Sequence, residues 1–250
     1  MRARRERERS QRARAPWRCQ DAQVQPPPSD LETLLAGEPG PQRAFTYPGE
    51  RWQAWTAHLD GVAPVMATLP AALDRSTTAR LVEDLLPSNA AGAFAVSMIW
   101  GHGWSGYGPY RTARVLTGMK RPAGEPVSPD VESRLNESIA IARASGPVEG
   151  YRFLNNRPGK IDGLGPAFFT KWLYFVTARA DENSDDAAPV LDALVLTWLA
   201  DNAGVVLRAG QTADYARYVG LMQSWGSPYG LAPAQVEERI FRLIRNDGDP

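Results

Sequence analysis

Cysteine, histidine and long apolar runs are scarce in this chain of 250 residues. The single cysteine, Cys19, excludes an intrachain disulfide, a cysteine-ligated zinc site and an iron–sulfur cluster. Two histidines, His58 and His102, leave little for a histidine-based metal centre. We therefore expect neither a metal nor a cofactor.

No stretch approaches the roughly eighteen consecutive apolar residues that a membrane-spanning helix needs. The arginine-rich start is not followed by the apolar segment of a secretory signal. We expect a cytoplasmic, nucleoid-associated protein with no membrane contact. Alternating strand-like runs are also nearly absent, which predicts an all-α fold of eight to ten helices.

The chain has ample material for a core, since 43% of its residues are hydrophobic and eight are tryptophans. Its formal charge of zero is unevenly distributed, because residues 1–20 contain eight arginines and two glutamates. Three prolines follow at Pro26–Pro28. We predict a disordered tail over residues 1–29 and a helical domain over residues 30–250. The tail is either a basic arm for nucleic acid or an extension without function.

Two zones of the remaining chain are basic. No acidic residue occurs between Leu85 and Gly124, where Arg111, Arg114, Lys120 and Arg121 fall. The second zone, residues 150–180, holds five Lys and Arg residues against one aspartate. A surface that faces a polyanion would be built from these zones.

Start signals predict several helices. The predicted helices are 90–100 behind Asn89, 110–116 behind Pro109, 130–144 behind Ser128 and Pro129, 213–225 behind Thr212, and 234–244 behind Pro233. Residues 190–199 are apolar enough to be buried on most faces.

Residues 151–178 predict a helix, a tight hairpin and a second helix. The first helix ends near Asn155, the turn covers residues 161–166, and the second helix covers residues 167–178. Gly163 and Gly165 would let a backbone approach closely, and N–H groups at the start of the second helix would bind a phosphate. Lys160 would face that phosphate. The alternative is a simple helix-to-helix turn.

The hairpin, Lys171 behind it and the segment Pro189–Asp192 resemble the helix-hairpin-helix DNA glycosylases. Residues 100–111 and 235–241 resemble the actinobacterial-type proteins described as having an 8-oxoguanine DNA glycosylase (OGG) fold. The resemblance covers residues 81–244. It implies an all-α fold of two helical subdomains with the active site between them. It also implies a damaged base turned out of the duplex and cleavage of its N-glycosidic bond.

The resemblance places Asp192 and Lys171 in catalytic roles. A carboxylate near C1′ would stabilise the positive charge that develops on the sugar; otherwise Asp192 is an ordinary acid at a helix start. Lys171 would form a Schiff base with C1′ and permit strand cleavage. In the lysine-bearing glycosylases the lysine stands two residues after the second hairpin glycine, where this chain has Ala167. Either Lys171 acts from one helical turn further on, or water is the nucleophile; Lys171 would then be a surface lysine or a phosphate contact.

Further residues are candidates for contact with DNA. Arg111 and Arg114 recur on one side of a helix and would contact phosphates. Aromatic rings stack on bases. The candidate base contacts are Tyr107, Tyr110, His102 and, as a pocket wall, Trp225. Packing within the core is the alternative for Trp225.

We therefore expect a monomeric DNA glycosylase that excises an oxidised or otherwise modified base, such as 8-oxoguanine, from double-stranded DNA. Three alternatives remain. They are a non-catalytic helix-hairpin-helix DNA-binding protein, a helical interaction protein, and a glycosylase that attacks modified bases of phage DNA in defence. The sequence leaves the identity of the base open.

Overall fold

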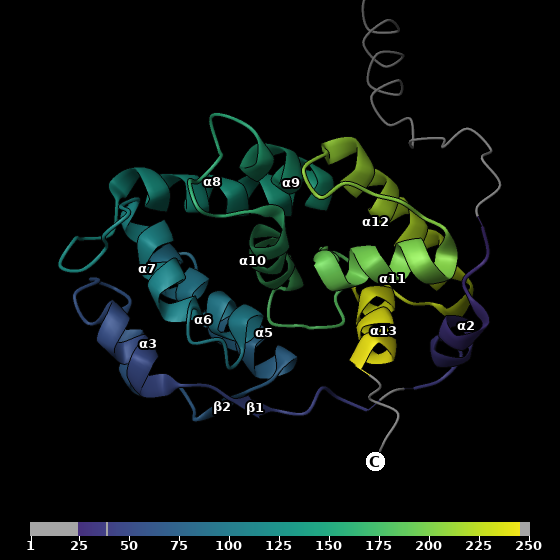
Figure 1. The fold of residues 1–250 in the computed structure, drawn as a ribbon, viewed down its shortest axis with the longest axis horizontal. Coiled ribbons are helices and arrows are strands. Elements are labelled where there is room, and N and C mark those ends of the chain that lie inside the picture. Colours follow the sequence, from purple (N-terminus) through teal and green to yellow (C-terminus); the bar gives the residue numbers. More distant parts are fainter. Residues whose placement is uncertain (1–24, 39, 246–250) are drawn as a thin grey trace, which may run out of the picture.

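The computed structural model describes residues 25–38 and 40–245, which form twelve α-helices, one short 3-10 helix and a two-stranded sheet. The all-α prediction is confirmed (Figure 1). The number of helices was underestimated because three short N-terminal helices lack strong start signals. They are α2 (Ser29–Leu35), α3 (Gly49–Thr56) and α4 (Ala63–Thr68), none with a side-chain cap.

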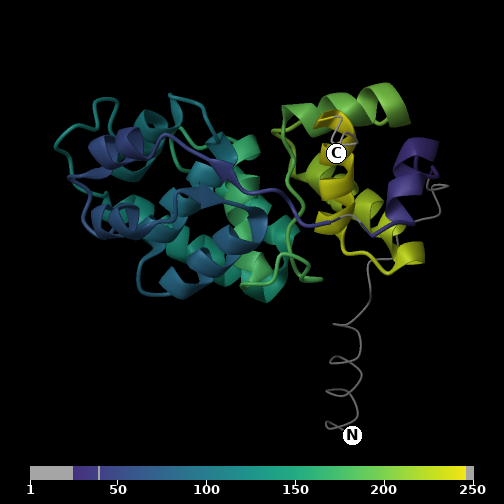
Figure 2. The same cartoon turned by 90° about the horizontal axis from the view of Figure 1, so that it is seen from below.

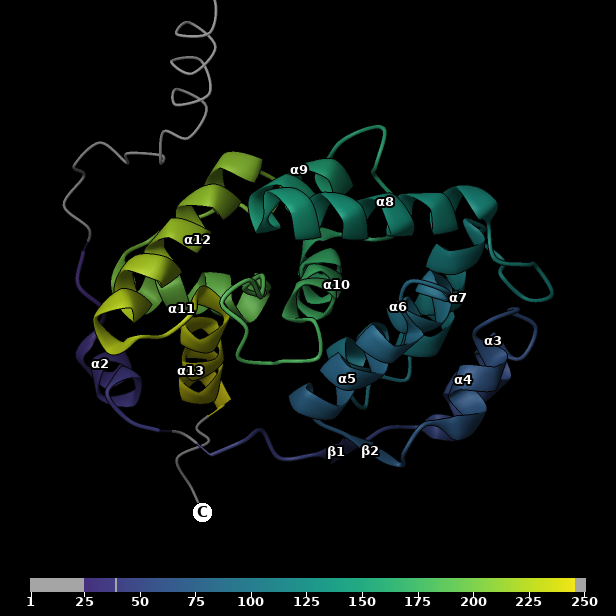
Figure 3. The same ribbon diagram turned by 180° about the vertical axis from the view of Figure 1, so that it is seen from behind.

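The helices gather in two lobes, which Figure 2 shows side by side. The first lobe contains α3, α4, α5 (Arg75–Leu85), α6 (Ala90–His102), α7 (Gly108–Thr117), α8 (Pro129–Ser145), α9 (Pro147–Asn155) and α10 (Pro166–Ala178). The second contains α2, α11 (Ala193–Ala203), α12 (Thr212–Gly226), the 3-10 helix η1 (Ser227–Tyr229) and α13 (Pro233–Arg245). From α2 onward the chain thus passes from the second lobe to the first and returns (Figure 3).

The crossing segment carries the first strand of the small sheet. Strand β1 (Phe45–Thr46) pairs antiparallel with β2 (Ala72–Leu73), with Phe45 opposite Leu73. The sheet lies against the first lobe beside α5 and α3 (Figure 1).

Helix α10 forms the centre of the first lobe. It packs on α5, α6, α8 and α9. Phe169, Trp172 and Phe175 are at most 1% exposed. The indole Nε1 of Trp172 donates a hydrogen bond to Ser138 Oγ at 2.9 Å, which satisfies the one polar atom of that ring. Burial on nearly every side holds α10 rigidly, and its N-terminal turns carry the hairpin and Lys171.

Most predicted helix starts agree with the structure. Asn89 caps α6, since its Oδ1 accepts from the N–H of Gly92 at 2.8 Å. The helices predicted behind Pro109, Ser128, Thr212 and Pro233 all form, each extended by one or two residues at its ends. The prediction for residues 190–199 was wrong, because α11 lies at the surface. Leu194 is 47% exposed and only one side of the helix is buried.

The predicted tail, residues 1–29, falls largely on residues 1–24, which lie outside the described residues. Gln25 is described, and its carbonyl accepts a hydrogen bond from Nε1 of Trp225 at 2.7 Å. Helix α2 then begins at Ser29. None of the helices formed by the described residues is long and apolar enough to cross a lipid bilayer.

Candidate active site

Lys171 and Asp192 meet where α10 of the first lobe approaches the start of α11 in the second. Nζ of Lys171 lies 3.0 Å from Oδ2 of Asp192. The lysine side chain is 10% exposed and the aspartate side chain 17%. The ion pair is therefore largely shielded from water. Charges in such an environment interact more strongly than charges at a surface.

Asp192 uses its two carboxylate oxygens differently. Oδ1 accepts hydrogen bonds from the N–H groups of Leu194 at 3.1 Å and Val195 at 3.2 Å, which caps α11. Oδ2 is left for Lys171. Asp192 is thus both an acid at a helix start and the partner of Lys171. The cap fixes the direction of the carboxylate.

The backbone before Asp192 is held by buried hydroxyl groups. Tyr215 Oη donates to the carbonyl of Pro189 at 3.0 Å, and Tyr218 Oη donates to that of Val190 at 2.8 Å. The N–H of Leu191 donates to Oγ1 of Thr170 at 3.2 Å. Since Thr170 precedes Lys171, this bond ties the segment of the carboxylate to the helix of the lysine.

Two neighbours shape the environment of Lys171. Its Nζ also donates to the carbonyl of Ala167 at 3.1 Å, one turn back along α10. A Cβ on Gly101 would lie 2.7 Å from Cδ of Lys171. Gly101 therefore makes room for the stem of the lysine, a role that its position in the sequence did not reveal.

The hairpin has the predicted form, with α9 ending at Asn155 and α10 beginning at Pro166. Gly163 has φ of +86°, a conformation that favours glycine. Gly165 has φ of −92° and ψ of 171°, and a Cβ there would meet no atom within 4 Å. The backbone conformation at Gly165 does not itself require glycine, because extended backbone accepts any residue; the close approach of a DNA backbone at this position stays a prediction.

Several backbone N–H groups at this hairpin donate no hydrogen bond to another described residue. They include the N–H groups of Gly163, Gly165 and Ala167. They precede or begin α10, at the positive end of its dipole. Such a group of donors is suited to an anion such as a backbone phosphate.

Phe168 joins several predicted residues into one layer beside Lys171. The ring of His102 stacks on that of Phe168, with centroids 4.2 Å apart and planes at 24°. Arg111 Cζ lies 4.6 Å from the Phe168 centroid and Lys171 Nζ lies 5.7 Å from it. Sequence reasoning missed Phe168 because an aromatic residue after a hairpin is usually read as core.

His102 is neutral at neutral pH. Burial, together with the positive charges of Arg111 and Lys171, lowers its pKa from 6.5 to about 4. The imidazole therefore adds no further positive charge beside Lys171.

The remaining candidates are spread around this layer. Lys160 is exposed, and its carbonyl accepts from Nη1 of Arg134 at 2.8 Å. Arg111 Nη2 lies 3.5 Å from the Gly163 carbonyl, and Arg114 is half-buried. Of these cations, Arg111 and Lys160 border the hairpin.

The aromatic candidates differ in exposure. Tyr107 is 54% exposed, and the neighbouring Trp104 is 67% exposed. Tyr110 stacks edge-on against Trp55 and donates from Oη to the carbonyl of Lys120. Trp225 is 2% exposed within the second lobe. Neither pocket described below is lined by Trp225, Tyr107 or Tyr110.

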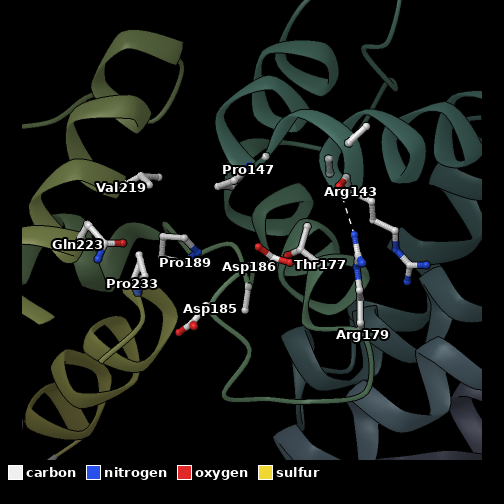
Figure 4. Close-up of a pocket in the computed structure, with 14 residues that line it drawn as sticks. Arg143, Pro147, Thr177, Arg179, Asp185, Asp186, Pro189, Val219, Gln223 and Pro233 are labelled. Carbon is white, nitrogen blue, oxygen red and sulfur yellow. Dashed lines mark hydrogen bonds between the residues drawn. The ribbon is translucent and has the colours of Figure 1, made fainter. Parts of the chain in front are cut away.

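Two pockets flank α10. A cavity of about 10 Å³ lies under the hairpin and is lined by His102, Arg111, Phe168 and their neighbours. A larger pocket of about 300 Å³ lies at the C-terminal end of α10, away from the hairpin. Figure 4 shows its lining residues coming from both lobes, Thr177 and Arg179 on one side and Val219 and Gln223 on the other. Lys171 and Asp192 do not line it. Among the described residues, no three histidine, cysteine, aspartate or glutamate side chains gather to hold a metal ion.

A family model described as "Putative 8-oxoguanine DNA glycosylase OGG-like protein" matches residues 38–241. The chain belongs to this family. The match covers most of the chain, including the hairpin, Lys171 and Asp192. No curated protein and no solved structure matches the chain. Membership of the OGG-like family supports a DNA glycosylase type of role and DNA as the substrate.

Proposed function

We propose that this OGG-like protein excises a modified base from double-stranded DNA by cleaving the N-glycosidic bond, with Lys171 and Asp192 as catalytic residues. One observation carries the proposal. An amine and a carboxylate from different lobes lie 3.0 Å apart, one turn behind a hairpin with backbone N–H groups that donate to no other described residue. A hairpin that only bound DNA would need no such pair.

The pair has the groups that glycosidic cleavage requires. When the bond between C1′ and the base breaks, the bonding electrons leave with the base and the sugar becomes positive. Asp192 stabilises this charge, and its orientation is already fixed by the α11 cap. In the lysine scheme, the ammonium group of Lys171 gives one proton to the departing base, and the amine that results forms the new bond to C1′ with its lone pair and keeps the positive charge. In the water scheme, water forms that bond and Asp192 accepts its proton.

The surface around the pair supports binding of the sugar–phosphate backbone. The donors of the hairpin and the guanidinium group of Arg111 lie on the same side of α10, beside His102 and Phe168. Phosphate contacts by backbone N–H groups and arginine position DNA without reading its sequence. Selection of the base to be excised then falls to the residues around Lys171, and 8-oxoguanine is the first candidate.

A panel of duplexes that each carry one modified base, 8-oxoguanine included, tests this function. Excision is detected as strand breaks after treatment with alkali. Borohydride added during turnover should trap wild-type protein on DNA if Lys171 attacks C1′, and the adduct should vanish in Lys171→Gln. Lys120→Gln is the matched control, since Lys120 is exposed beyond the end of α7.

The result also separates the two schemes. In the water scheme no adduct forms, Lys171→Gln keeps part of its excision activity, and uncut abasic sites accumulate. If the wild type excises no base from any duplex, or if Lys171→Gln and Asp192→Asn both excise at the wild-type rate, the proposed function is wrong.

A further inference from the structure

Two ion pairs formed by described residues connect the lobes. One is Lys171–Asp192. The other joins Arg75 of α5 to Glu237 of α13, with Nη1 and Nη2 of the arginine each 3.3 Å from Oε2 of the glutamate. These side chains are 3% and 2% exposed, so the second pair is more completely buried than the first.

Arg75 contacts the surroundings of Lys171 through two aromatic rings. Its Cζ lies 5.1 Å from the ring centroid of Trp100 and 4.9 Å from that of Tyr174. Trp100 adjoins Gly101, against which the stem of Lys171 packs. Tyr174 lies one turn after Lys171 on α10. Arg75 thus contacts α10, which carries Lys171, and α6, against which the stem of Lys171 packs.

Glu237 lies in the second lobe, as Asp192 does. Helix α13 packs on α11, which Asp192 caps. Burial raises the pKa of Glu237 to about 7, with opposing effects from Arg75 and Lys171 and a further increase from Asp192. The two ion pairs therefore lie close enough to influence each other's charges.

The charged and titratable groups that face Glu237 come from five elements. They are Arg75 from α5, Lys171 and Tyr174 from α10, Asp192 before α11, Tyr215 and Tyr218 from α12, and Glu238 from α13.

A buried ion pair adds little to stability compared with apolar residues of the same size, because both charges lose their hydration. It does, however, require one relative placement of its two partners, since a small displacement leaves buried charges unpaired. A pair of this kind between lobes restricts how one lobe can move against the other.

We propose that Arg75 and Glu237 are positioning residues. Their ion pair holds the second lobe where Asp192 reaches Lys171. The catalytic consequence rests on the proposed glycosylase function, whereas the effect on the contact between Lys171 and Asp192 does not.

Two substitutions of Glu237 separate the effect of its charge from the effect of its side-chain length. Glu237→Gln removes the charge and still accepts a hydrogen bond from Arg75, and Glu237→Asp keeps the charge but is one methylene shorter. Glu238→Gln is the matched control, because Glu238 adjoins Glu237 and pairs with Arg242 within α13. Retained helicity and a cooperative melt show that each variant is folded. If Glu237→Gln does not fold, Glu237→Asp and Arg75→Lys carry the test.

The first measurement is the modification of Lys171 by reductive methylation, read by mass spectrometry in the full chain. The protein has only two other lysines, Lys120 and Lys160, and both are exposed and serve as internal standards. The ratio of modified Lys171 to modified Lys160 should rise severalfold in both Glu237 variants, because Asp192 no longer covers the amine. It should stay at the wild-type value in Glu238→Gln. An unchanged ratio in both folded Glu237 variants overturns the proposal.

The second measurement is single-turnover excision on the duplex that the wild type cuts. Both Glu237 variants should lose about tenfold or more in rate, as expected when a catalytic group is misplaced. Their Kd for the duplex should stay near the wild-type value. An unfolded variant would bind the duplex more weakly, so this measurement separates a misplaced catalytic group from a loss of folding. The wild-type rate should fall as the pH drops through about 7, where Glu237 gains a proton, and this step should be missing in Glu237→Gln.

The two measurements fail independently. If the wild type excises no base, the proposed function fails while the modification ratio still decides the positioning role. If excision is normal in folded Glu237 variants, or falls while Lys171 stays protected, the positioning role is refuted and the glycosylase function stands.

Discussion

His102 and Glu237 should give the protein two opposing pH dependences of stability. The pKa of His102 is lowered from 6.5 to about 4 by burial and by the charges of Arg111 and Lys171. The pKa of Glu237 is raised from 4.5 to about 7, chiefly by burial. Both groups are thus neutral in the folded protein over part of the range in which they are charged in the unfolded chain.

The signs follow from proton binding. Between pH 5 and 6.5 the unfolded chain binds more protons at His102, so this residue adds stability as the pH rises and loses it as the pH falls towards 4. The folded protein binds more protons at Glu237, so this residue contributes most stability at low pH and loses it as the pH rises through about 7. Each effect amounts to about 1.5 kcal/mol over this window. In the wild type the two largely cancel.

Single substitutions should remove the cancellation. In His102→Gln the free energy of unfolding should fall by about 1.5 kcal/mol relative to wild type between pH 5 and 6.5, and in Glu237→Gln it should rise by a similar amount. The assay is urea unfolding followed by tryptophan fluorescence in steps of half a pH unit. The double variant should return to the wild-type profile. Profiles parallel to the wild type in both single variants would refute the reasoning.

Three further predictions concern the hairpin and the pair formed by Lys171 and Asp192. Gly163→Val should weaken DNA binding in a protein that keeps its helices, because the left-handed backbone there costs a β-branched residue about 1–2 kcal/mol. Gly165→Val should weaken binding without this strain, because its side chain would stand between the hairpin and the DNA backbone; wild-type affinity of both variants in a gel-shift titration would contradict this. Gly101→Ala should displace the stem of Lys171 and slow excision, while the melting temperature changes little. A normal excision rate would contradict the close contact between a Cβ at position 101 and Cδ of Lys171. Asp192→Asn should lose on the order of a hundredfold in excision rate while DNA binding persists; full activity would exclude Asp192 from the mechanism.

Short-range signals account for the parts of the fold that were predicted correctly. Asn89 caps its own helix through a bond to a residue three positions away. Pro166 and Gly163 confine the hairpin by their own backbone preferences. Such contacts involve only neighbours in the chain, and a sequence pattern is sufficient to reveal them. The short helices α2, α3 and α4 have no such signal, and they form because packing against the lobes stabilises them.

The prediction of Lys171 and Asp192 came from a resemblance, since nothing local marks either residue. Their contact joins positions 21 residues apart, and it depends on hydroxyl groups from α12 that hold the segment before Asp192. The role of Gly101 was hidden for the same reason, because the side chain that needs its space belongs to another helix.

The sequence by itself determined an all-α protein, the hairpin and most helix boundaries. Only the tertiary structure decided which charges meet. Arg75 and Glu237 are 162 positions apart and become a buried pair because the returning chain packs α13 of the second lobe near α5 of the first. Helix and turn preferences act over a few residues, whereas burial, and with it the shifted pKa of Glu237 and of His102, arises only when distant segments together exclude water.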